Sequence, residues 1–180
     1  LPSRSRLMPS TGNTVKLIAA NTLVRAIQGL LQGLKVYVLM DSWYMRRRVI
    51  SANTRLGFSV IGQVRIDTRL YDLPLPRRHG ELGRSRKYGE KYTPEHIDQL
   101  HRTITTLKIY GKEQRVRLRS QLVKARFLDG QLVHAVWCEF ERSNGEWKAA
   151  SLILSTDITL TAEQVIESYS LRWSIEPMFN

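Results

Sequence analysis

The sequence predicts an α/β fold in which a β-rich insertion interrupts the core. Residues 35–40 and 58–66 read as strands and residues 42–56 as a helix between them, a strand–helix–strand unit within about thirty residues. Such a unit implies a parallel pair of strands. Strand-like segments joined by turn sequences follow over residues 115–155. A strongly capped helix near Thr161 closes the pattern.

The composition describes a basic chain long enough for one full-sized domain. Its 180 residues include 42% hydrophobic residues, and 28 Lys and Arg against 16 Asp and Glu give a formal charge of +12. This excess favours a polyanionic partner, such as nucleic acid, an anionic membrane or a ribosome, over a merely soluble basic protein. No apolar run reaches the ~20 residues of a membrane span. The single Cys138 fits a reducing compartment, so we expect a cytoplasmic protein.

The first elements are a helix and a buried strand. Asn13 can cap a helix whose apolar residues recur at helical spacing to about Leu31. The run over residues 35–40 is β-branched and aromatic, and Asp41 ends it. The helix expected over residues 42–56 leads into the second strand.

The middle of the chain differs in amino-acid composition from the segments before it. Residues 67–92 are rich in proline, glycine and basic residues and are predicted to form a mobile basic loop. Thr93 followed by Pro94 predicts the start of a short helix. Two turn sequences predict hairpins in the β-rich part, Asp129-Gly130 and Ser143-Asn144-Gly145.

The last helix is the best defined. Thr161 and Gln164 form a capping box, and the helix is expected to continue at least to Glu176 and to bend at Pro177. We therefore divide the chain into a first part of the core, a basic loop with a β-rich insertion, and a last strand with its helix, at residues 1–66, 67–150 and 151–180.

Two carboxylates are the candidates for chemistry. Asp41 lies where α/β sheets place functional groups, at the carboxyl end of a strand, although a helix N-cap explains that position equally well. Tyr169, Arg172 and Glu176 share one stripe of the last helix, within roughly 60° of arc. A solvated helix face is the alternative. A metal-binding carboxylate beside a phosphate-binding arginine explains the stripe better, because the residues between them are largely apolar.

Basic residues supply candidate contacts to a polyanion. Arg115, Arg117 and Arg119 alternate with apolar residues, so one face of a strand carries three guanidinium groups suited to a phosphate backbone. An edge strand charged against aggregation is an equally good explanation. Arg46 and Arg47 lie just past the first candidate carboxylate, and a solvated helix face is their alternative.

A family resemblance rests on these same residues. The sequence from Tyr169 to Glu176, YSLRWSIE, matches the Y-x2-R-x3-E part of the Tyr-Arg-Glu-Lys signature of a large group of bacterial insertion-sequence transposases. Asp41, in LMDSWYMRR, resembles the second catalytic Asp of that group. The segments IGQVR, RKYG, YGKEQ and LSTD also resemble it, so the similarity spans nearly the whole chain.

The resemblance implies a DDE-type transposase with an RNase H-like core of the retroviral-integrase superfamily. In that family, carboxylates hold two Mg²⁺ (or Mn²⁺) ions for DNA cleavage and strand transfer, which would make Asp41 and Glu176 metal ligands and catalytic residues. Tyr169 and Arg172 would grip the DNA backbone at a transposon end. Family members act as dimers or larger synaptic complexes on DNA. Because the group is bacterial and acts on DNA, the resemblance also implies a bacterial, nucleoid-associated protein.

The sequence departs from the family pattern in two ways. The first catalytic Asp should precede Asp41, but no earlier Asp is present, and the Lys of the signature would fall beyond Asn180. We therefore expect a C-terminal fragment that is inactive alone. Asp157 is the one other internal candidate carboxylate, and we expect it to be a cap or turn residue. The alternatives are a truncated, inactive DNA-binding remnant and an RNA- or ribosome-binding basic protein.

Overall fold

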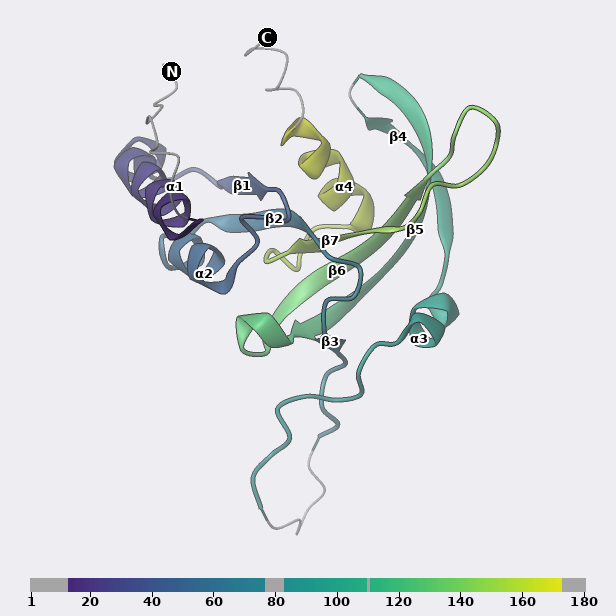
Figure 1. Cartoon of the computed structure of the whole chain (residues 1–180), viewed down its shortest axis with the longest axis horizontal. Helices are drawn as coiled ribbons and strands as arrows, with labels where there is room; N and C mark the ends of the chain where they lie inside the picture. Colours follow the sequence, from purple (N-terminus) through teal and green to yellow (C-terminus); the bar gives the residue numbers. More distant parts are fainter. Residues whose placement is uncertain (1–12, 77–82, 110, 173–180) are drawn as a thin grey trace.

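A mixed β-sheet forms the body of the protein (Figure 1). The computed structural model describes residues 13–76, 83–109 and 111–172. Across these residues the sheet has seven strands in the order β1-β2-β7-β6-β5-β3, with β4 also paired to β5. The strands are β1 (Tyr37–Met40), β2 (Ser59–Val64), β3 (Leu70–Tyr71), β4 (Thr103–Ile109), β5 (Lys112–Ala125), β6 (Gln131–Phe140) and β7 (Ser151–Ser155).

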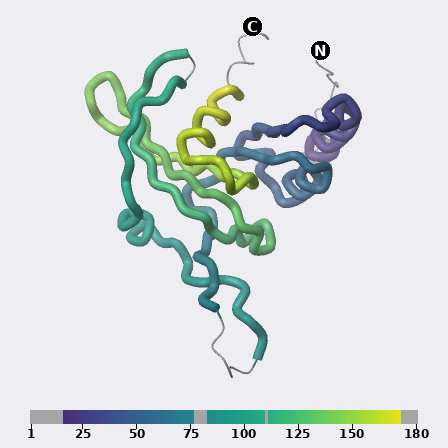
Figure 2. Tube along the Cα trace, turned by 180° about the vertical axis from the view of Figure 1, so that it is seen from behind, coloured from purple at the N-terminus to yellow at the C-terminus, as the bar shows by residue number. Residues whose placement is uncertain are grey.

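Four α-helices lie around this sheet in the described residues. They are α1 (Asn13–Gln28), α2 (Arg47–Arg55), α3 (Pro94–Gln99) and α4 (Ala162–Ser170), with 3₁₀ turns η1 (Gly29–Leu31) and η2 (Arg126–Leu128). In both views α4 lies apart from the α1–α2 pair (Figures 1 and 2). A strand–helix–strand unit, β1-α2-β2, is thus present as predicted.

The strands β1 and β2 form the predicted parallel pair, in a register from Tyr37 opposite Ser59 to Met40 opposite Gly62. The remaining strand pairs are antiparallel. The mixed α/β prediction is therefore confirmed, and this arrangement is compatible with the RNase H-like core that the family resemblance implies. Strands from all three predicted segments join the same sheet, so the predicted division of the chain stays a prediction.

Alternation along the strands buries both faces of the sheet. On β2, Val60 and Val64 belong to one apolar cluster and Ile61 to the other. The first cluster includes Val49 and Ile50 of α2, and the second includes Val165 and Ile166 of α4. Successive side chains of a strand point to opposite faces, so α2 and α4 cover the two sides of the sheet.

The helix predicted over residues 42–56 begins later, at Arg47. The side chain of Asp41 holds residues 42–44 in a turn, and the backbone of Arg46 is extended, with φ −113° and ψ 143°. Residues 42–46 therefore form part of the connection between β1 and α2. The end of the helix agrees with the prediction, because Gly57 adopts φ 81° directly after the C-cap.

The basic segment at residues 67–92 is more ordered at its ends than predicted. It contributes β3, which pairs with β5, and Asp72 exchanges backbone hydrogen bonds with Gly89 and Glu90. Between these ends, residues 72–76 and 83–88 extend away from the sheet (Figure 1). The β-rich part also starts earlier than residue 115, at β4.

The predicted turns and the predicted caps of α3 and α4 are present, with one difference, whereas Asn13 is the first residue of α1 and its capping role stays a prediction. The hairpin at Asp129 and Gly130 has a longer loop than a two-residue turn, because η2 precedes two left-handed residues with φ 60° and 79°. The turn at Gly145 is closed by a 2.9 Å bond from its N–H to the carbonyl of Arg142. Both helix starts are capped by threonine side chains, those of Thr93 and Thr161.

The last helix ends earlier than predicted, since α4 stops at Ser170 with Leu171 as its C-cap. Glu176 and the bend predicted at Pro177 lie outside the described residues. Cys138 is buried, and the reducing compartment predicted from it stays a prediction. Within residues 13–76, 83–109 and 111–172, no helix has the length and apolar character needed to cross a membrane.

Candidate active site and nucleic-acid interface

Asp41 directly follows β1, at the carboxyl end of the parallel pair. Its Oδ1 accepts hydrogen bonds from the backbone N–H groups of Trp43, at 3.0 Å, and Tyr44, at 3.2 Å. The capping role weighed from the sequence is therefore real, although Asp41 caps a turn and not α2. Both bonds use the same oxygen, and neither engages Oδ2. The cap is thus compatible with a role as a metal ligand.

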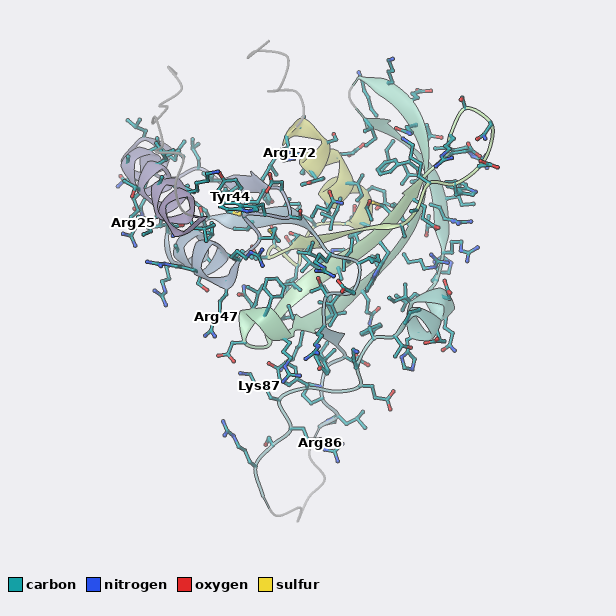
Figure 3. The ribbon with its side chains drawn as sticks, in the orientation of Figure 1. Arg25, Tyr44, Arg47, Arg86, Lys87 and Arg172 are labelled. Carbon is teal, nitrogen blue, oxygen red and sulfur yellow. The ribbon has the colours of Figure 1, made fainter. Side chains whose placement is uncertain are left out.

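Asp41 and Arg172 line the same cavity of about 270 Å³. The cavity lies where β1, α1 and α2 meet, and Arg172 reaches it from the end of α4 (Figure 3). Tyr44 and the buried Asn53 contribute the other polar groups. Two residues that are 131 positions apart in the sequence (172 − 41) are thus brought to one place. A carboxylate and a guanidinium here could hold a cation and a phosphate side by side.

Tyr169 lies beneath Arg172 with only 7% of its surface exposed. The guanidinium carbon of Arg172 is 5.7 Å from the centre of the Tyr169 ring, within cation–π range. Burial raises the pKa of the Tyr169 hydroxyl above its ordinary value; the charge of Asp41 acts in the same direction and that of Arg172 opposes it. The geometry favours a role for Tyr169 in positioning Arg172. Direct contact of Tyr169 with DNA stays a prediction.

Glu176 lies outside the described residues, so its predicted approach to Asp41 stays a prediction. Among the described residues, no group of three or more histidine, cysteine or acidic side chains could hold a metal ion. Asp41 is the one predicted metal ligand that falls within them. Its carboxylate is an oxygen donor of the kind that Mg²⁺ and Mn²⁺ prefer, so the one ligand that the described residues supply suits a hard divalent cation.

Asp157 is a structural residue, as expected from the sequence. Its carboxylate accepts a hydrogen bond from the Tyr37 hydroxyl at 2.8 Å and pairs with Lys35 at 2.9 Å. It also accepts bonds from the backbone N–H and the hydroxyl of Thr159. Tyr37 begins β1 and Lys35 lies just before it, whereas Asp41 follows the end of the strand. Asp157 therefore joins the turn after β7 to β1, away from the cavity of Asp41.

A larger basic groove begins just past Asp41. Its volume is about 590 Å³, and Ser42 and Trp43 form the wall nearest to Asp41. Five arginines line it, of which sequence reasoning had selected the first two: Arg46, Arg47, Arg65, Arg69 and Arg126. Asp67 is the acidic residue of the lining, and it pairs with Arg65 at 2.8 Å. The groove thus offers a net positive surface next to the candidate carboxylate.

The arginine row on β5 is balanced by carboxylates. Arg115 pairs with Glu141 at 2.9 Å and Arg117 with Glu139 at 2.7 Å. Arg119 is buried and bridges Glu139 and Asp98, so three arginines face three carboxylates. The edge-strand explanation is wrong for Arg115 and Arg117, because this part of β5 lies between β4 and β6. Binding of DNA by this row stays a prediction, and its paired charges make the groove beside Asp41 the stronger candidate.

Sequence reasoning missed the arginines that reach the groove from the position after β2, the segment before β3 and η2. One signal was available for Arg65, which follows β2. Residues 13–66 contain eight basic residues and a single acidic one, Asp41, a net charge of +7 (8 − 1). Arg69 and Arg126 gave no such signal, because only the pairing of β3 with β5 brings them to the same groove.

A transposase DDE domain is the family whose model matches this chain, over residues 7–180. The match covers 174 of the 180 residues (180 − 7 + 1), so the chain belongs to the family of DDE-domain transposases. Comparison with curated proteins returns no match. The family supports a transposase function, with DNA as the partner and a divalent metal ion as the usual cofactor.

Proposed function

We propose that this chain is the catalytic region of an insertion-sequence transposase of the Tyr-Arg-Glu-Lys group. It cleaves DNA phosphodiesters at the ends of the element and transfers the strand, with Asp41 and Glu176 as catalytic metal ligands. The observation that carries the proposal is the shared cavity of Asp41 and Arg172 at the carboxyl end of β1. Open α/β sheets place their ligands in that position.

Each residue of the site has a distinct task in this proposal. Asp41 and Glu176 bind Mg²⁺ or Mn²⁺, which when bound activates the attacking oxygen and stabilises the leaving oxygen. Arg172 binds a phosphate of the DNA backbone next to the metal, since a guanidinium fork matches phosphate oxygens. Tyr169 holds Arg172 in place through its buried ring.

The neighbouring groove provides the path for the DNA. The groove starts at Ser42 and Trp43, which follow Asp41, and Arg46 and Arg47 lie along it. Backbone phosphates bound here would fix the register of the DNA relative to the cavity without reading its sequence. The group's members act as dimers or larger synaptic complexes, and we extend that assembly to this protein.

The test is cleavage of DNA carrying the element's ends by the full-length transposase in Mg²⁺ or Mn²⁺. Asp41→Asn is the informative variant, because an asparagine Oδ1 can still accept the hydrogen bonds of Trp43 and Tyr44 while the charge is lost. We expect cleavage to fall by ~1000-fold, or ~4 kcal/mol of transition-state stabilisation. Glu176→Gln should have a similar effect.

Two further variants complete the test. Asp157→Asn is the matched control, since it removes a carboxylate outside the cavity, and it should cleave at the wild-type rate at temperatures where it is folded. Arg172→Lys keeps the charge but loses the fork, and we expect cleavage to fall by ~10-fold or more. Wild-type cleavage by Asp41→Asn would overturn the proposal. Intact, salt-sensitive DNA binding without cleavage by the wild-type protein would favour a DNA-binding protein that cannot cut.

A further inference from the structure

A second basic groove runs between α1 and α2, with a volume of about 550 Å³. Four exposed arginines and three small polar residues line it: Arg25, Arg47, Arg48 and Arg55, with Asn21, Thr22 and Ser51. Figure 3 labels Arg25 on α1 and Arg47 on α2, and both lie apart from Arg172. The family resemblance and the proposed active site use none of these residues except Arg47.

Helical spacing builds the groove from both sides. On α2, Arg47, Ser51 and Arg55 follow one another at four-residue intervals, so they form one stripe along the helix. On α1, Asn21 and Arg25 are also four residues apart. The two stripes face each other across the packed α1–α2 pair, which gives the groove two basic walls.

No carboxylate lines this groove among the described residues. Within the described part of the chain, Arg47 pairs with Asp129 at 3.3 Å, an exposed contact, whereas Arg25, Arg48 and Arg55 form no ion pair. The contrast with β5 is direct, because each arginine of that row has a carboxylate partner. An uncompensated cluster of arginines repels itself, so a polyanionic ligand would stabilise it.

The start of α2 strengthens this positive potential. Arg47 and Arg48 occupy its first turn, which contains no acidic residue, and no side chain caps its first N–H groups. Cations at a helix N-terminus oppose the helix dipole, so this arrangement is unfavourable for the free protein. A bound phosphate would interact favourably with the dipole and with both guanidinium groups.

The groove is separate from the cavity of Asp41. The two share no lining residue, since α1 contributes Ala20 and Val24 to the cavity but Asn21 and Arg25 to the groove. They therefore lie on different sides of the contact between α1 and α2. A phosphate bound in the groove is therefore a different one from a phosphate bound beside Asp41.

We infer that the α1–α2 groove binds the phosphodiester backbone of a duplex DNA segment that flanks the cleavage site. The inference rests on the proposed function, which makes DNA the partner. The contacts are to phosphates, so the groove adds affinity that depends on salt and not on sequence. Asn21 and Ser51 supply additional donors for phosphate oxygens.

The experiment measures binding of a labelled duplex of scrambled sequence by the full-length transposase, by fluorescence anisotropy, between about 50 and 200 mM salt. The test variant is Arg25→Gln/Arg48→Gln/Arg55→Gln, which spares Arg47 because that side chain also lines the other groove. The matched control, Lys108→Gln/Lys112→Gln/Lys148→Gln, removes the same charge from exposed positions on and beside the β4–β5 hairpin. A charge-preserving variant replaces the three groove arginines by lysine.

We expect the groove variant to bind at least ~10-fold more weakly, and the slope of log K against log salt to become shallower by ~2 to 3, since each phosphate contact contributes ~0.9. The control should keep the wild-type slope, and the lysine variant most of it. Equal slopes for the groove variant and its control would overturn the inference.

The cleavage assay separates the two proposals. If the wild-type protein cleaves DNA with Mg²⁺ but the groove variant binds DNA like wild type, the proposed function stands and the groove inference is wrong. If the salt dependence of the groove variant is shallower but the wild-type protein never cleaves, the groove inference stands and the proposed function is wrong.

Discussion

Replacing Asp157 by alanine should destabilise the fold without removing a catalytic group. The variant loses four hydrogen bonds or ion pairs, to Tyr37, Lys35 and both the N–H and the hydroxyl of Thr159. A hydrogen bond to a charged group is worth ~1.5–3 kcal/mol, but Lys35 is 64% exposed and is rehydrated when the bond is lost. We therefore expect a loss of ~2–4 kcal/mol in the free energy of unfolding.

Thermal or urea unfolding of the full-length protein measures this loss. At ~2–4 °C per kcal/mol for a chain of this size, the melting temperature should fall by roughly 5–15 °C. The hydrogen bonds to Thr159, Lys35 and Tyr37 lower the pKa of Asp157 below its ordinary value, against the effect of its burial. Its contribution is thus present above the unfolded-state pKa of ~3.9 and is lost as the pH falls towards the folded-state pKa. The difference in the free energy of unfolding between wild type and variant should therefore decrease below pH ~4.

A change of less than ~0.5 kcal/mol would refute this assignment, because such a value is typical of a surface substitution. So would a stable variant that no longer cleaves DNA, since Asp157 would then act as a third catalytic carboxylate.

Two further predictions concern the parts of the sheet around the site. Gly62→Ala should lower the free energy of unfolding by ~1–3 kcal/mol and displace Asp41, because the added Cβ would press on the Met45 sulfur and lie 2.8 Å from the Met40 carbonyl oxygen. Urea unfolding and DNA cleavage measure these effects, with Gly29→Ala as the control because there is open space at its Cβ. Equal stability of the two variants would contradict the prediction. Cys138 should resist iodoacetamide in the folded protein at pH 8, because burial raises the pKa of its thiol to about 12, and rapid labelling without unfolding would show that the thiol is accessible.

The local elements of the fold could be predicted because their signals are short-range. The capping box of Thr161 and Gln164 is read from four residues, and the structure shows both of its hydrogen bonds, at 2.9 and 3.2 Å. The parallel pair of β1 and β2 followed from one strand–helix–strand pattern. In each case the residues that determine the element also contact one another.

The start of α2 could not be read from composition alone. Residues 42–46 are compatible with a helix, and only the geometry of the Asp41 side chain turns them into a connection. The structure shows the cap at position 41, whereas the functional role of this residue at a strand end stays a prediction. Sequence patterns could not separate the two interpretations, because the cap uses only Oδ1 and is compatible with a ligand role for Oδ2.

The least predictable feature was which arginines are paired with carboxylates. Arg115, Arg117 and Arg119 gave the clearest pattern in the sequence, yet carboxylates from β6, α3 and the turn after β6 balance them. Those partners lie about 20 residues or more away in the chain, beyond the reach of a local pattern. The α1–α2 groove gave a weaker pattern, although the shortage of acidic residues in positions 13–66 was visible in the sequence.

The central claim is that Asp41 binds the divalent metal ion that drives DNA cleavage, and a change of metal preference tests it most directly. Asp41→Cys replaces a hard oxygen ligand by a softer thiolate, which disfavours Mg²⁺ more than Mn²⁺. We expect full-length Asp41→Cys to be inactive in Mg²⁺ and to recover part of its cleavage in Mn²⁺, whereas Asp41→Ala recovers none. Wild-type cleavage by Asp41→Cys in Mg²⁺, or equal recovery of the cysteine and alanine variants in Mn²⁺, would contradict the claim.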